Sequence, residues 1–261
     1  MQRKFIEQAV EVIQDDETVI GLAVAGSFIT NEIDEFSDVD LILITAEKVA
    51  PDIDKMVAYA KRFGKFLNGF TGEHVGERRV LICLYDDPLI HVDIKFLTPN
   101  EFEQRVEDPV IVFERDNAIT KIISSTQSVW PQTDYQWIED RFWTWIHYAA
   151  LKLGRGENFE ALDFLSFIRT TVTSPLLQVK NGHLPRGLRK VERNFGEADL
   201  ERLVSTVPHY TTTSIFSSLD NTIKLYQELR IDLFPLTIQF RTETEEKTLA
   251  YLDGVKNKRL K

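Results

Sequence analysis

Apolar and polar positions follow two different patterns along the chain. Up to about residue 125, short apolar runs bounded by polar residues predict strands, and they alternate with segments of helical spacing. Strands are expected at 19–25, 39–44, 78–85 and 90–97, and helices at 5–13, at 52–67 and from Pro99 onward. The glycines at 69, 72 and 76 are placed in a loop before a strand. This order predicts a mixed sheet flanked by helices.

Beyond Pro131 the apolar residues recur at helical spacing only. One stripe runs from Phe142 to Leu153 and another from Phe164 to Val172. Further helices are expected at 198–207, 214–229 and 242–251, and the basic end 256–261 is expected to be frayed. The predicted fold class is therefore α+β, with an N-terminal mixed-sheet domain (1–128) and a C-terminal helical bundle (129–261).

The charge balance narrows the classes of partner. The 261 residues carry a net charge of −10, with no evident basic stripe, which argues against a sequence-independent nucleic-acid binder, though not against a local basic patch, and favours a cationic partner. Cys83 is the single cysteine, so no internal disulfide forms, and its apolar surroundings predict a buried core residue. No signal peptide or membrane-spanning run is found, so we expect a cytoplasmic protein without a membrane partner.

The segment from Ala25 to Ile44 carries the candidate chemistry. The first strand ends at Gly26-Ser27, a loop of ten residues follows, and Asp38-Val39-Asp40 opens the next strand. Alternate strand residues share a face, so Asp38 and Asp40 project together. Two adjacent carboxylates repel each other unless a cation lies between them, and magnesium prefers carboxylates combined with substrate phosphates. The pattern therefore predicts a magnesium and phosphate site.

Three further residues complete this hypothesis. Gly26 would let backbone N–H groups approach a phosphate, and Ser27 would add a hydroxyl donor. Asp93 lies within the strand at 90–97, among otherwise apolar inward positions, and is the candidate third acid. The alternative is structural: an Asp-x-Asp pair often marks a turn or a solvated strand end, and Asp93 alone fits a salt-bridged strand residue. The combination of all these features favours the catalytic interpretation.

This combination resembles the signature of the polymerase-β-like nucleotidyltransferase superfamily. Residues 34–40 look especially like the aminoglycoside nucleotidyltransferases, and residues 93–101 are similar to the third-acid region of the aminoglycoside 6-adenylyltransferases. The resemblance implies transfer of AMP from ATP to a hydroxyl of a small, aminoglycoside-like acceptor, with release of pyrophosphate and two Mg²⁺ ions. It also implies that Asp38, Asp40 and Asp93 are catalytic metal ligands, with proton acceptance as the other role open to Asp93. Members of the family often carry Arg and Gly after the Gly-Ser, where this chain has residues 28–31, so one phosphate contact is in question.

Other polar residues have two interpretations. Tyr148, Lys152 and Arg155 share one helix face, where Lys152 is a candidate nucleotide ligand and a solvated face is the alternative. The same choice applies to Arg169. The four tryptophans are assigned to core and interdomain packing, and the five histidines show no zinc spacing.

Two alternative functions stay open at this point. One is a protein- or RNA-directed nucleotidyltransferase resembling antitoxins, although such proteins are usually shorter and lack so large a helical part. The other is a non-catalytic nucleotide-binding module, against which the three intact aspartates count.

Overall fold

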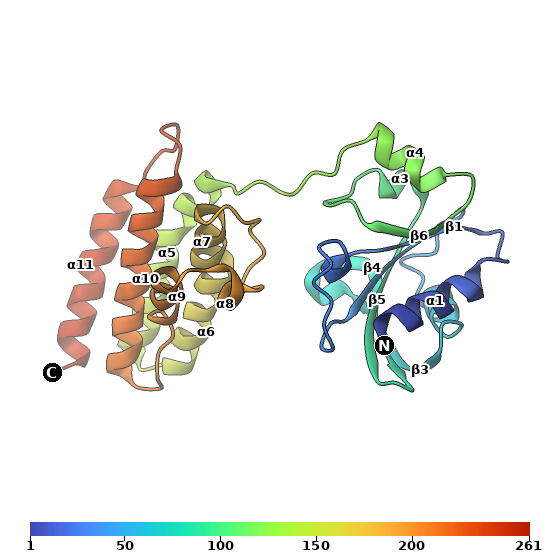
Figure 1. The fold of residues 1–261 in the computed structure, drawn as a ribbon. Helices are drawn as coiled ribbons and strands as arrows, with labels where there is room; N and C mark the ends of the chain where they lie inside the picture. The colour runs from blue at the N-terminus through green and yellow to red at the C-terminus, as the bar shows by residue number, and fades with distance from the viewer. The chain divides into compact units, whose positions relative to one another are not determined.

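The structure, a computed structural model, describes all 261 residues and divides them into two compact units. The units are Met1–Pro131 and Gln132–Lys261, whereas the sequence placed the division between residues 128 and 129. The first unit contains a six-stranded sheet with helices, and the second contains helices only (Figure 1). The predicted α+β fold class is confirmed. None of the helices combines the length and apolar character needed to cross a membrane.

The sheet of the first unit has the strand order β3-β4-β5-β2-β1-β6. Its strands are β1 (Val19–Val24), β2 (Val39–Thr45), β3 (Lys65–Gly72), β4 (Glu77–Asp86), β5 (Ile90–Leu97) and β6 (Val110–Glu114). Four of the five strand pairings are antiparallel, and the pairing of β2 with β5 is parallel. The central strands β2 and β5 therefore run in the same direction, side by side.

The two faces of this sheet are covered to different extents. Alternation along β2 sends Val39, Leu41 and Leu43 into a core with α1 (Gln2–Ile13) and α2 (Ile53–Ala60). On the other face, Ile44 and Leu97 pack with α3 (Pro99–Phe102) and α4 (Ala118–Ser125) in a smaller cluster. That smaller cluster lies at the ends of β2 and β5, so the beginnings of both strands stay partly open on this face.

Two sequence expectations in this unit are wrong. The helix predicted over 52–67 ends at Ala60, and Lys65 already begins β3. Gly69 and Gly72, predicted in a loop, lie within that strand. β3 and β6 are the two edge strands and are mostly exposed or half-buried. In β3, polar residues and glycines interrupt the apolar positions, whereas β6 does contain an apolar run, Val110–Phe113, which the sequence prediction did not assign to a strand. Cys83 is buried as expected, and burial raises the pKa of its thiol to about 12.

The second unit is a helical bundle around one core. Its elements are α5 (Tyr135–Arg155), α6 (Asn158–Ile168), the π-helical turn η3 (Arg169–Thr173), α7 (Ser174–Lys180), α8 (Val191–Asn194), α9 (Glu197–Val204), α10 (Thr212–Leu233) and α11 (Thr242–Arg259). Phe142, Ile146 and Leu153 of the predicted stripe are buried in the core. The basic end is helical through Arg259 rather than frayed, because positive side chains stabilise the last turn of a helix.

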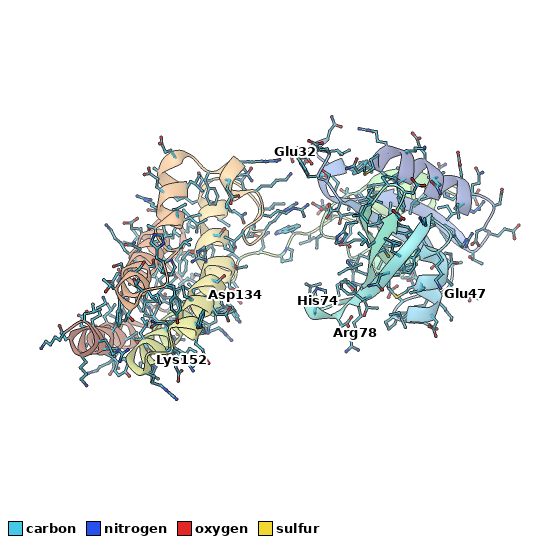
Figure 2. The ribbon with its side chains drawn as sticks, turned by 90° about the horizontal axis from the view of Figure 1, so that it is seen from below. Glu32, Glu47, His74, Arg78, Asp134 and Lys152 are labelled. Carbon is cyan, nitrogen blue, oxygen red and sulfur yellow. The ribbon has the colours of Figure 1, made fainter.

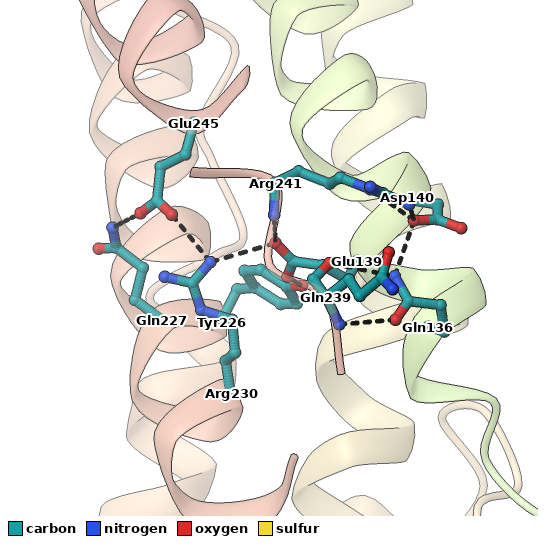
Figure 3. Close-up of polar contacts among 9 residues, drawn as sticks. All are labelled: Gln136, Glu139, Asp140, Tyr226, Gln227, Arg230, Gln239, Arg241 and Glu245. Carbon is teal, nitrogen blue, oxygen red and sulfur yellow. Dashed lines mark hydrogen bonds and ion pairs between the residues drawn. The ribbon is translucent and has the colours of Figure 1, made fainter. Parts of the chain in front are cut away.

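A buried carboxylate joins three segments of this bundle (Figure 3). Glu139 on α5 is 0% exposed and accepts hydrogen bonds from the Tyr226 hydroxyl on α10 and from the Arg241 backbone N–H, at 2.9 Å. Arg230 Nη1 lies 3.3 Å from the same carboxylate and 2.8 Å from Glu245 on α11. A buried charge is tolerated only with such partners, so this network fixes α5, α10 and α11 against one another.

Candidate active site

Asp40 and Asp93 are direct neighbours in the sheet. They are paired positions of the parallel β2–β5 ladder, and adjacent strands lie roughly 4.8 Å apart. Both side chains project from the partly open face, because they alternate with the buried residues Val39, Leu41, Val92 and Ile94. Asp38 comes two residues before Asp40, just ahead of the strand, and is also partly exposed. The register thus brings together two of the three predicted acids, although they lie far apart in sequence.

Gly26 lies directly against Asp40. The residue has φ +63°, a left-handed conformation that favours glycine, and it opens the short turn η1 (Gly26–Phe28) after β1. A β-carbon at this position would overlap the Asp40 Oδ2 atom. The Ala25 N–H also donates to the Asp40 carbonyl at 2.9 Å, which ties the turn to β2. The Gly-Ser turn and the Asp-x-Asp pair, predicted from their order in the sequence, are therefore in contact.

Ser27 has a buried hydroxyl that no protein group satisfies. The residue is 8% exposed, and its Oγ has no hydrogen-bond partner. Leaving a buried hydroxyl unpaired costs about 1–3 kcal/mol, so such a group calls for an explanation. A phosphate oxygen at the Gly26-Ser27 turn would satisfy it. Both the backbone of this turn and the Ser27 hydroxyl therefore fit a phosphate group.

The protein side chains alone do not complete a magnesium site. No three Asp, Glu, His or Cys side chains lie close enough together to hold a metal ion by themselves. Asp93 Oδ1 is also engaged by His91 Nε2 at 2.8 Å, a partner that the sequence did not indicate. Magnesium, however, is usually held by one or two carboxylates completed by substrate phosphates. Asp40, with one neighbouring aspartate and a nucleotide phosphate, has the donor chemistry for this ion.

A pocket of about 190 Å³ opens next to the two aspartates. Its charged lining residues are Asp40, Arg79, Asp93, Lys95, Glu101, Arg105 and Glu107. Glu77 forms ion pairs with Arg79 at 2.6 Å and with Lys95 at 3.0 Å. The hydrogen bonds from Arg79, which outweigh the opposing effect of burial, lower the pKa of Glu77 to about 2. The lining combines charges of both signs, so it matches a polar ligand and does not by itself select a cationic one.

The sequence missed the cations of this pocket. Lys95 is two residues beyond Asp93 on β5 and therefore on the same face, which the strand periodicity already implied. Arg79 is on β4, and only the pairing of β4 with β5 brings it close to Lys95. The alternating pattern was thus sufficient to place Lys95, whereas Arg79 required the sheet order.

Lys152 has partners within its own unit. It lies on α5 (Figure 2), and its Nζ is 2.8 Å from carboxylate oxygens of both Glu157 and Glu160. Its pKa is raised, chiefly by the hydrogen bond to Glu157. Arg155 pairs with Glu157 at 2.8 Å. These contacts match the helix-face interpretation, and the role of Lys152 as a nucleotide ligand stays a prediction.

Two other residues of the helical unit also have structural roles. The Arg169 side chain donates to the hydroxyl and carbonyl oxygens of Thr206 at 2.9 and 2.8 Å, and burial lowers its pKa. Trp143 is buried in the core, where it contacts Phe142 and Tyr226. Hydrogen bonding therefore accounts for Arg169, and core packing accounts for Trp143.

Comparison of the chain with known proteins gave matches among solved structures only. No family model matches the chain, and no curated protein matches it. Similar solved structures include an aminoglycoside 6-adenyltransferase from Bacillus subtilis, with 13% identity, a TM-score of 0.41 and 98% of each chain covered. A spectinomycin adenyltransferase from Enterococcus faecialis, solved with ATP and spectinomycin, has 10% identity and a TM-score of 0.33, with 98% of this chain and 100% of that one covered. A CdnC:HORMA-deltaN complex from E. coli MS115-1 has 9% identity and a TM-score of 0.29, with 97% and 89% covered.

Proposed function

We propose that the chain is a metal-dependent nucleotidyltransferase that moves AMP from ATP onto a hydroxyl of a small polar acceptor and releases pyrophosphate. The observation that carries the proposal is the contact between the Gly26-Ser27 turn and Asp40, with Asp93 in register beside it. An unsatisfied hydroxyl, an open backbone and paired carboxylates are the groups that a metal-bound triphosphate requires.

Each residue of the candidate site has a separate role in the proposed transfer. The Gly26 backbone approaches the phosphates, and the Ser27 Oγ donates to a phosphate oxygen. Asp40, with Asp38 or Asp93, would hold magnesium, which neutralises phosphate charge when bound. The acceptor hydroxyl oxygen attacks the α-phosphorus and forms a new P–O bond. The bond from the α-phosphorus to the bridging oxygen breaks, and pyrophosphate leaves with that electron pair.

Asp93 is the group we assign to the proton. Its carboxylate lies beside Asp40, at the edge of the pocket that would receive the acceptor. His91 holds one of its oxygens at 2.8 Å, which orients the carboxylate so that the other oxygen can accept the hydroxyl proton. His91 is therefore a positioning residue in this scheme.

The acceptor is proposed from the pocket lining. Four acids and three cations line the pocket, so a neutral polyol and an aminoglycoside are both compatible with it.

The test incubates the protein with ATP, magnesium and a panel of aminoglycosides and uncharged polyols, and detects an added AMP by mass. The Asp40→Asn variant is the control. The absence of an AMP adduct and of pyrophosphate across the panel, together with labelling of a protein or RNA, would favour the macromolecule-directed alternative.

A further inference from the structure

One row of side chains crosses the partly open face of the sheet, from the candidate site to the edge strand. Asp40 on β2 is paired with Asp93 on β5. Asp93 is paired in turn with Ile82 on β4, and Ile82 with Phe70 on β3. Directly paired residues project to the same face of a sheet. With strands roughly 4.8 Å apart, Ile82 lies about 5 Å and Phe70 about 10 Å from Asp93 along this row.

The character of this face changes from polar to apolar between β5 and β4. The residues of β5 that project from it are polar: His91, Asp93 and Lys95. Their paired residues on β4 are apolar: Leu84, Ile82 and Val80. These three residues and Phe70 form what we call the apolar strip, and none of them belongs to a hydrophobic core cluster of this unit. Contiguous apolar side chains left at the surface beside polar ones are typical of a binding site.

Phe70 ends the apolar strip with an aromatic ring. The residue is 47% exposed, and its ring contacts the imidazole of His74, with centroids 5.8 Å apart. Leu84 is also exposed, at 39%. A half-exposed aromatic ring offers a flat apolar surface on which a ligand ring can stack. The strip therefore has a stacking surface about 10 Å from Asp93.

The geometry of the proposed transfer directs the acceptor toward this strip. β1, which ends just before the Gly26-Ser27 turn, and β5, which carries Asp93, lie on opposite sides of β2. In the proposed function the turn binds the phosphates that leave as pyrophosphate. The attacking and leaving oxygens are roughly in line in such a displacement, so the acceptor approaches from the side of β5. Beyond β5 on that side lie β4 and β3 with the apolar strip.

We propose that the acceptor carries an aromatic or similarly flat apolar ring, which binds to Phe70 and Ile82 while its hydroxyl lies at Asp93. This inference rests on the proposed function, and it narrows the class of acceptor. Val80 lines the pocket beside the aspartates as well as the strip, so the two surfaces are continuous. Polar residues on β5 and apolar residues on β4 match a molecule with one hydroxylated end and one apolar end. An aryl glycoside has this arrangement, whereas an uncharged polyol without a ring leaves the strip exposed to water.

The test measures binding of two glucosides to the full chain by saturation-transfer NMR. Magnesium and α,β-methylene-ATP, which cannot transfer AMP, are present throughout. Phenyl glucoside should bind about tenfold more tightly than methyl glucoside, as expected for one stacking contact, with saturation strongest on the phenyl protons. Phe70→Ala should raise the Kd of phenyl glucoside about tenfold, and Phe70→Leu should give an intermediate value.

Leu89→Ala is the matched control variant. Leu89 is 64% exposed in the turn between β4 and β5, so this change also removes an exposed apolar side chain from the same unit. The variant should bind phenyl glucoside like the wild type. Circular dichroism of all variants checks that the fold is kept, which is expected because Phe70 is half-exposed on an edge strand.

Three results overturn the inference: no binding of phenyl glucoside, equal affinity for the two glucosides, or an unchanged Kd in Phe70→Ala. A change from dimer to monomer in that variant, measured by light scattering, also overturns it, because the strip would then bind a second copy of the chain. Failure of the proposed function gives a different result. Phenyl glucoside would then bind in a manner that depends on Phe70, yet with ATP and magnesium no acceptor would gain AMP and no pyrophosphate would form.

Discussion

Substituting Gly26 with alanine tests whether the Gly-Ser turn positions Asp40. Alanine at position 26 has to adopt φ +63°, which costs about 1–2 kcal/mol of stability for a residue other than glycine. It also overlaps Asp40 Oδ2, so either the carboxylate or the turn must shift. A displacement of about 1 Å among reacting groups can lower a rate about 10²-fold. We therefore expect Gly26→Ala to lose about two orders of magnitude in pyrophosphate release while the protein stays folded.

Gly76→Ala is the matched control. Gly76 also has a left-handed backbone, with φ +81°, but no heavy atom lies within 4 Å of an added β-carbon. Both variants should therefore lose similar stability in urea unfolding followed by circular dichroism, and only Gly26→Ala should lose activity. Equal turnover in the two variants would refute the reasoning, because the contact with Asp40 would then have no role in transfer.

Three further predictions concern charged side chains. Asp40→Asn removes charge repulsion from Asp93, so the melting temperature of the variant should equal or exceed that of the wild type while pyrophosphate release is lost. Unchanged pyrophosphate release would show that Asp40 has no role in transfer. The lowered pKa of Glu77, about 2, implies stability present above pH 4.5 and lost as the pH falls toward 2. Glu77→Gln should therefore lower the urea midpoint at pH 7 and match the wild type at pH 2. Glu139→Ala leaves the Tyr226 hydroxyl and the Arg241 backbone N–H without their acceptor, while Arg230 keeps its ion pair with Glu245, and it should cost about 1–3 kcal/mol for each unsatisfied donor, against under about 1 kcal/mol for exposed Asp140→Ala.

The central part of the site could be predicted from the sequence because it lies on buried strands. The alternation along β2 and β5 sends Val39, Leu41, Val92 and Ile94 into the core and Asp40 and Asp93 to the opposite face, whereas the sequence prediction had counted Asp93 among the inward positions of its strand. Their register was not predictable, since a parallel pairing between distant strands leaves no local signal. The edge strand β3 was read as helix and loop because exposed residues give it no apolar pattern.

The distribution of charge in the sequence predicted less of the structure than the apolar pattern did. Spacing placed Lys152 on a helix face, but it did not show that two carboxylates lie 2.8 Å from its ammonium group. The net charge of −10 also gave no sign that Arg186, Arg189, Lys190 and Arg193 lie close together in sequence, because an average over the chain conceals a local excess of the opposite sign. Ser174 donates to the Gly187 carbonyl and Gln178 to the Arg189 carbonyl in this stretch, and these contacts had no signal in the sequence.

The parallel pairing of β2 with β5 also has a consequence for biosynthesis. β2 leaves the ribosome early, but one of its two neighbours in the sheet follows only after α2, β3 and β4. Until then the edge of this apolar strand has unpaired backbone groups and can pair with another chain. A fragment that ends before Ile90 should therefore aggregate, whereas one that ends at Pro131 contains every strand of the sheet.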